Sequence, residues 1–167
     1  IFRLDGRIYD HSELNRIIGT EIGIQIERPD RPGGVLFDNM TALDNLCTSL
    51  IPKAGQHIIR KKIVSSILSE ALRWFPKEML LQPLSSWSYP ERLRFSYYRW
   101  YLLNPGLLIC FFPFAGQEST HHKMIIDLLV LCAQRGMAVW IISSGIDAIC
   151  EKTDNEEFLR RLHYLNK

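Results

Sequence analysis

Leu107-Leu108-Ile109-Cys110-Phe111-Phe112-Pro113 is the stretch of this sequence that decides the fold. It leaves a tight turn, Asn104-Pro105-Gly106, and its closing proline is followed by a polar turn at residues 116–119. An apolar run bounded in this way is typical of a strand inside a protein core. The sequence therefore predicts a buried strand over residues 107–112.

A helix and a second apolar strand follow the first strand. We expect the helix over Lys123–Arg135, where Gly136 stops it, and the strand over Met137–Ser143. Two strands joined by a helix form a βαβ unit, in which the strands pair in parallel. The sequence thus predicts an α/β fold with a mostly parallel sheet and flanking helices.

Shorter elements stand at the two ends of the chain. At the amino-terminal end we expect a β-hairpin over residues 1–9 with an Asp5-Gly6 turn, and a short helix over Ser12–Ile18 capped by Ser12. A strand over Glu21–Ile26 and a loop over residues 28–34 follow. At the carboxyl-terminal end we expect a final helix over Glu156–Leu165.

A block of helices separates these strands. The first expected helix begins at a Thr41 cap, with Asp44 completing a capping box, and runs to about Leu50. The second covers Gln56–Phe75 and is ended by Pro76. The third covers Glu91–Leu103 and starts at Ser88 or Pro90. We expect one domain over residues 1–167. Residues 1–40 and 105–167 would form an α/β core, and about 41–104 a helical lobe with the helix that leads back to the core.

Composition excludes several classes of protein. A net charge of +2 is too small and too scattered to indicate nucleic-acid binding. The apolar stretch at 97–116 is interrupted by Arg99 and by the turn at 104–106, so its pieces are too short to cross ~30 Å of hydrocarbon. The four cysteines lack metal-binding spacing and are expected to be reduced core residues. The chain begins with isoleucine, and we expect it to be a fragment.

Acidic residues are missing where an α/β nucleotide hydrolase would carry them. In such proteins the carboxyl end of a buried strand holds carboxylates that bind Mg²⁺ and position the attacking water. Here that end carries Phe111 and Phe112. A phenylalanine ring offers no oxygen to a hard cation and accepts no proton from water. The alternative is that both are core residues of a strand in an unrelated fold.

The order of the pieces resembles the ATP-binding subunits of ABC transporters, and more narrowly the second cassette of tandem sugar importers of the ribose/galactose type. The Asp5-Gly6 hairpin resembles that cassette's "L-D-G-K" segment. Residues 21–36 are similar to its strand and "P-E-D-R-K-x-x-G-L-V-L" segment, and Met40–Leu46 to "L-S-V-x-E-N-I". The resemblance spans roughly residues 1–155 and implies a P-loop NTPase-like core beside a helical lobe.

The same resemblance extends to the segments that surround the nucleotide in that family. Trp87–Arg94 matches the position of the "L-S-G-G-x-Q-Q-K" signature, Phe111-Phe112 that of the carboxylate pair, and Ser143-Ser144 that of "S-S-E". The resemblance implies that Glu27, Ser88, Glu118, Ser143 and Ser144 are vestiges of a nucleotide site. It implies no metal ligand and no catalytic residue, because the positions of the acidic pair have become Phe111 and Phe112.

The glycine-rich phosphate loop, G-x-x-x-x-G-K-[ST], occurs nowhere in the chain. In the family it precedes the hairpin that begins here at Ile1. We therefore expect no cofactor in these residues, and ATP binding only if an upstream segment supplies the loop. Tyr89 and Pro90 replace two signature glycines, and a bulky ring at that point should keep backbone away from a phosphate.

Each candidate has a simpler structural interpretation. Ser88 can be a helix cap, Glu27 a solvated loop carboxylate and Glu118 a surface turn residue. Adjacent helical residues point about 100° apart, so His121-His122 is expected at the surface rather than as a metal pair. The aromatic helix 91–103 could indicate stacking on nucleic acid, but we expect it to bury its aromatic side chains and to solvate Arg92, Arg94 and Arg99.

Three functions remain open. The first is a non-hydrolysing cassette of a sugar-transporter-like system that docks on a transmembrane permease subunit or on a second, active cassette. It would lie in the cytoplasm, peripheral to the inner face of the membrane and without inserting into it. The second is a regulatory interaction module on the same scaffold without a transport role. The third is an active ATPase, which needs an upstream phosphate loop and a replacement base.

Overall fold

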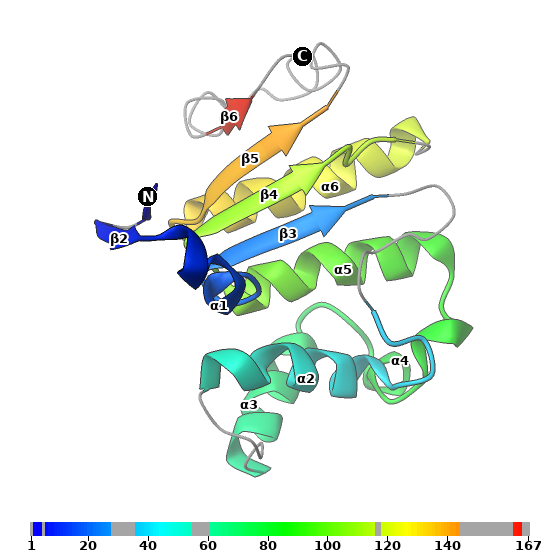
Figure 1. Ribbon diagram of the computed structural model, residues 1–167. Coiled ribbons are helices and arrows are strands. Elements are labelled where there is room, and N and C mark those ends of the chain that lie inside the picture. Colours follow the sequence, from blue (N-terminus) through cyan, green and yellow to red (C-terminus); the bar gives the residue numbers. More distant parts are fainter. Residues whose placement is uncertain are drawn as a thin grey trace.

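The fold is built on a parallel sheet of four strands in the order β3-β4-β5-β6. The computed structural model describes residues 2–4, 6–27, 36–54, 61–115, 118–143 and 162–164. The strands are β3 (Ile22–Ile26), β4 (Leu107–Phe111), β5 (Ala138–Ile142) and β6 (Leu162–Tyr164). They lie side by side in Figure 1, and β4, α6 and β5 form the expected parallel βαβ unit.

One face of this sheet is covered by two helices, α5 (Tyr89–Leu103) and α6 (Ser119–Gln134), which lie behind the strands in Figure 1. Register pairs Leu108 with Val139 and Cys110 with Ile141, so these four side chains share the covered face. All four are buried in one cluster with apolar residues of α5 and α6. Asn104, in the left-handed conformation at φ 47°, ends α5 just before β4.

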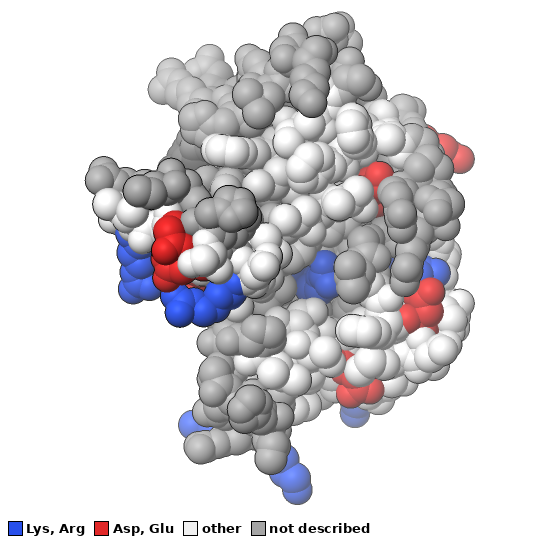
Figure 2. Space-filling view, viewed as in Figure 1, with Lys and Arg blue, Asp and Glu red and all other residues white. Residues whose placement is uncertain are grey.

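The opposite face of the sheet is partly open. The register places Ile26 and Phe111 on this face at the carboxyl ends of their strands, and Trp140 at the middle of β5. Ile26 is 47% exposed and Trp140 is 39% exposed. Figure 2 views this side of the molecule and shows mostly uncharged atoms over the strands. A parallel sheet is ordinarily buried on both faces, so this open apolar face is unusual.

The amino-terminal hairpin is confirmed. Strand β1 (Phe2–Leu4) pairs antiparallel with β2 (Arg7–Tyr9), and η1 (His11–Glu13) and α1 (Leu14–Ile17) follow. The helix cap is Asp10 rather than Ser12, because the Asp10 Oδ1 atom accepts the backbone N–H groups of Ser12 at 2.7 Å and of Glu13 at 3.1 Å.

The helical region beside the sheet contains α2 (Ala42–Ala54), α3 (Lys61–Ala71), α4 (Lys77–Leu80) and η2 (Leu84–Ser86). Thr41 caps α2 as expected, since its Oγ1 atom accepts the Asp44 N–H at 3.0 Å and donates to the Asp44 carboxylate at 2.7 Å. Helix α2 runs beyond Leu50, and α3 ends at Ala71 instead of Phe75. The chain turns there because Trp74 and Phe75 both donate to the Ala71 carbonyl.

Several expected boundaries are wrong. The end of the chain is the clearest case, because residues 162–164 form β6, which pairs in parallel with residues 139–141 of β5, and not the end of a helix. Pairing with the edge of β5 gives its backbone N–H and C=O groups hydrogen-bond partners, and this gain outweighs the local helical pattern. Residues 156–161 and 165 of this expected helix lie outside the described residues, as do residues 56–60 of the helix expected over Gln56–Phe75, the loop at 28–34 and Cys150. Cys47, Cys110 and Cys132 are buried free thiols. No helix within the described ranges is long and apolar enough to cross a membrane.

Candidate functional site

The carboxyl ends of β3, β4 and β5 meet at one edge of the sheet, where the sequence places its candidates. The Glu27 N–H donates to the Phe111 carbonyl at 3.1 Å, and the Phe112 N–H donates to the Ile142 carbonyl at 2.7 Å. These bonds place Glu27, Phe111 and Phe112 side by side, with Ser143 next along the edge. Ser144 lies outside the described residues.

The two phenylalanines occupy different environments. Phe111 is half-buried as the last residue of β4, so the strand is one residue shorter than expected. Phe112 follows in the left-handed conformation at φ 51° with 44% of its side chain exposed. That backbone conformation is unusual for a bulky residue.

Within the described ranges, no cluster of three or more His, Cys, Asp or Glu side chains is arranged to hold a metal ion.

Glu27 lies inside the protein, so its interpretation as a solvated loop carboxylate is wrong. The residue is 3% exposed, and its carboxylate accepts the Gln25 Nε2–H at 2.6 Å. Burial raises the pKa of the neighbouring Tyr97 hydroxyl far above its ordinary value, and charges at Cys110 and Glu27 add to the shift. The Glu27 carboxylate is therefore an internal group of the fold, beneath the edge of the sheet.

Gln25 connects Glu27 to α5. Its Oε1 atom accepts the Trp100 indole N–H at 2.7 Å, and its Nε2 atom also donates to the Ser96 hydroxyl at 3.3 Å. This network was not predicted from the sequence. A signal was present, because Gln25 interrupts an apolar strand on the face that the parallel sheet must bury, and a buried amide needs partners.

Known structures share this arrangement of sheet and helices. The cassette cbiO1 from Clostridium perfringens, part of the ABC transporter complex cbiONQ, superposes with a TM-score of 0.68 at 19% identity over 97% of this chain. The ATP-binding cassette MJ0796, in a dimeric post-hydrolysis state with ADP and phosphate, superposes with a TM-score of 0.64 at 20% identity over 98% of this chain. The chain has the ABC-cassette fold. The alternative of an unrelated fold is therefore wrong.

Sequence comparison agrees with the fold but at low identity. A Clostridium perfringens (strain 13 / Type A) protein named as an ABC transporter ATP-binding protein, CPE1583, is 21% identical over 137 residues, which is 81% of this chain. The chain spans 23% of that relative's length, and 60% and 67% of the lengths of the two solved cassettes. No known protein-family profile matches it.

In this cassette fold, Ser88 starts α5 as a cap. The Ser88 N–H donates to the Glu91 carboxylate at 2.8 Å, and the Ser88 hydroxyl donates to the same oxygen at 2.6 Å. The next residue, Tyr89, is half-buried and packs with its ring 6.1 Å from the His121 ring. The beginning of α5 is thus occupied by local capping and by aromatic packing.

Glu118 is exposed and immediately precedes α6, as expected for a surface residue. His121 and His122 are only partly exposed. Both are half-buried, and the His122 ring lies 5.0 Å from the Phe114 ring. Apolar contacts between the start of α6 and its neighbours explain this difference from the sequence expectation.

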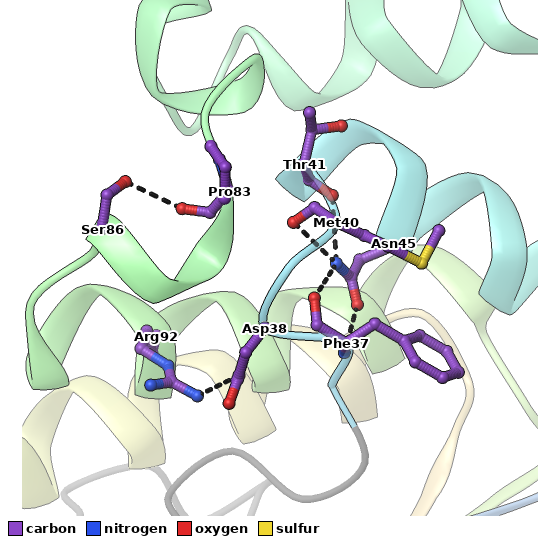
Figure 3. A network of polar contacts seen from close by, with 8 residues as sticks. All are labelled: Phe37, Asp38, Met40, Thr41, Asn45, Pro83, Ser86 and Arg92. Atoms are coloured by element: carbon purple, nitrogen blue, oxygen red, sulfur yellow. Dashed lines mark hydrogen bonds and ion pairs between the residues drawn. The ribbon is translucent and has the colours of Figure 1, made fainter.

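The aromatic helix α5 buries its rings, but it does not solvate all of its arginines. Arg99 is buried, with its guanidinium 4.7 Å from the centre of the Trp100 ring. Arg92 is partly buried and forms an ion pair with Asp38 at 2.5 Å (Figure 3). Cation–ring stacking and pairing across the fold compensate for the water that these groups lose.

Proposed function

We propose that this chain is a non-hydrolysing cassette domain that acts by docking, in a sugar-transporter-like system. The observation that carries the proposal is the pair Phe111 and Phe112 at the end of β4. Neither Phe111 nor Phe112 offers an oxygen ligand to a divalent cation, so these two side chains do not fit Mg²⁺. The sugar specificity rests only on the sequence motifs quoted above.

The remaining candidates fit a nucleotide site that has been lost. Glu27 is engaged with Gln25 beneath the sheet, and Ser88 is engaged with Glu91 at the helix cap. We regard Glu27, Ser88, Glu118, Ser143 and Ser144 as vestiges of nucleotide contacts. ATP binding would require a phosphate loop from outside these residues.

The partner in this proposal is a permease subunit or a second cassette, and the docking surface is the helical lobe at about 41–90. Exposed apolar side chains in and beside this region support it, because Phe37 and Leu81 are both about half exposed. The solved relatives fit this kind of partner, since cbiO1 is part of a transporter complex and MJ0796 is dimeric. The protein would then lie on the cytoplasmic side, peripheral to the membrane.

Hydrolysis is tested on the whole protein that contains this chain. We expect no Mg²⁺-dependent release of phosphate from ATP above the buffer background, while an active cassette assayed in parallel turns over. Turnover that follows the protein through successive purification steps, and that is lost when the protein is removed by antibody, would contradict the proposal.

Docking is tested by charge insertion. We expect Phe37→Lys or Leu81→Lys to prevent co-purification of the permease, while Ile8→Lys on the distant hairpin, also an exposed apolar position, leaves it intact. Circular dichroism verifies that each variant is folded. Absence of the permease from the unmodified protein would instead favour a regulatory module without a transport role.

A further inference from the structure

A cavity of about 440 Å³ lies between α5, α6 and the turn that follows α3. Its volume falls within the range of about 300–1,000 Å³ that is usual for small-molecule sites. Trp74 and Arg94 line one side, and Lys123, Asp127, Leu128 and Leu131 of α6 line the other. None of the candidates at the sheet edge belongs to this lining, so the cavity is a separate feature of the fold.

Arg94 is the central polar group of this cavity. Its guanidinium lies 5.8 Å from the centre of the Trp74 ring and 5.3 Å from that of Phe75. The residue is half-buried, and among the described residues it has no carboxylate partner. Contact with two rings restricts the position of the guanidinium but leaves N–H donors available. A planar fork of donors held in this way is suited to a carboxylate.

The charges of the cavity favour one negative group. Lys123 of α6 adds a second positive charge to that of Arg94. Asp127 offsets the charge of Lys123, because its carboxylate lies 3.6 Å from the Lys123 Nζ atom. Both partners of that pair are exposed, so water screens it and it contributes little. The lining therefore carries a single excess positive charge, which we assign to Arg94 because Lys123 pairs with Asp127.

Apart from Thr120, the rest of the lining is apolar. The Trp74 ring, the buried Leu128 side chain and the half-buried Leu131 side chain offer a surface for a ring or an aliphatic chain. We propose that this cavity binds a small organic monoanion, in which a carboxylate pairs with Arg94 and an aromatic or aliphatic body packs against Trp74 and Leu131.

The test uses naphthalene-2-carboxylate as the probe and naphthalene-2-methanol as its neutral counterpart. The Trp74 indole N–H signal, identified by its loss in Trp74→Phe, is followed by NMR during titration of each compound. We expect a saturable shift with the carboxylate and about tenfold weaker binding of the alcohol, because the charged hydrogen bond is lost. Equal binding of both compounds, no saturation with the carboxylate, or an equal shift with inorganic sulfate would overturn the proposal.

Variants test the role assigned to Arg94. We expect Arg94→Gln to weaken carboxylate binding about tenfold and Arg94→Lys to weaken it less, because the charge remains without the fork. Asp127→Asn should strengthen binding. Arg16→Gln, which changes an exposed arginine of α1 that does not line the cavity, should leave binding unchanged. Unchanged affinity in a folded Arg94→Gln protein refutes the site. If that variant does not fold, the comparison of the two compounds on the unmodified protein still decides.

Discussion

At Gly23 the backbone of β3 comes closest to α5. A Cβ atom at this position would lie 2.8 Å from the Trp100 Cε3 atom and 3.0 Å from the Leu108 Cδ1 atom. The Trp100 ring cannot move away easily, because its N–H is held by Gln25. We expect Gly23→Ala to lower the free energy of unfolding by about 1–3 kcal/mol, the usual cost of overpacking a core. Urea unfolding followed by circular dichroism measures it.

A double-mutant cycle isolates the cause of this effect. Trp100→Leu removes the ring, so the additional cost of Gly23→Ala should shrink in that background. An equal cost of Gly23→Ala with and without the ring would show that another contact, such as that with Leu108, rather than the contact with Trp100, is responsible.

Among the elements, the connection that enters α2 is held by one amide side chain. Asn45 is buried; its Oδ1 atom accepts the Phe37 N–H at 2.8 Å, and its Nδ2 atom donates to the carbonyls of Phe37 and Thr41, each at 3.0 Å (Figure 3). Loss of the side chain would leave the Phe37 N–H without its acceptor, and the carbonyls of Phe37 and Thr41 would keep only the backbone N–H groups of Met40 and Asn45 as donors. We expect Asn45→Ala to cost about 2–3 kcal/mol of unfolding free energy.

Thr41→Ala is the matched comparison for Asn45→Ala. It removes only the helix cap, and should cost about 1 kcal/mol. Thermal and urea unfolding of both variants check the order. A cost of Asn45→Ala no larger than that of Thr41→Ala would mean that Asn45 is not the group that holds the connection.

The same elements show what sequence patterns could predict. The strand 107–111 and its parallel partner follow from apolar runs between turns, because such runs must be buried. Three features depend instead on long-range packing: the burial of Glu27 and Arg99, the half-buried histidines, and the pairing of residues 162–164 with β5. Local spacing carries no information on which side chains a distant helix covers, so these features could not be predicted from it.

Within the described residues, the sheet has one face covered by α5 and α6 and a second face that Tyr9 and Ile17 cover in part. Trp140 is a large exposed aromatic residue on this partly open face. We expect Trp140→Thr to change the free energy of unfolding by less than about 1 kcal/mol, because a half-exposed strand position tolerates a β-branched residue. It should also reduce the fluorescence of bound 8-anilinonaphthalene-1-sulfonate. Leu81→Thr, at an exposed apolar site elsewhere, should reduce it less, and equal reductions would argue against a continuous apolar face.

Buried thiols and phenols connect the stability of the whole molecule to pH. Burial raises the pKa of Cys132 from 9.0 to about 12, and burial followed by the charge of Cys132 raises that of Cys110. Burial likewise raises the pKa values of Tyr97 and Tyr98. Above about pH 9 the unfolded chain loses these protons first, so the folded state binds more protons and stability falls as pH rises.

One group acts in the opposite direction. Burial lowers the pKa of Arg99 from 12.5 to about 10, so between these values the unfolded chain holds the extra proton and stability gains with pH. Burial also raises the pKa of Cys47, and these five raised groups outnumber Arg99. The net expectation is a decline in stability that starts near pH 9 and reaches at most about 1.4 kcal/mol per pH unit for each thiol or phenol. Urea unfolding between pH 7 and 10.5 measures this decline. Cys132→Ala should make the decline of the unfolding free energy with pH less steep, whatever its effect at neutral pH. Parallel plots of unfolding free energy against pH for the variant and the unmodified protein would show that the Cys132 thiol does not contribute.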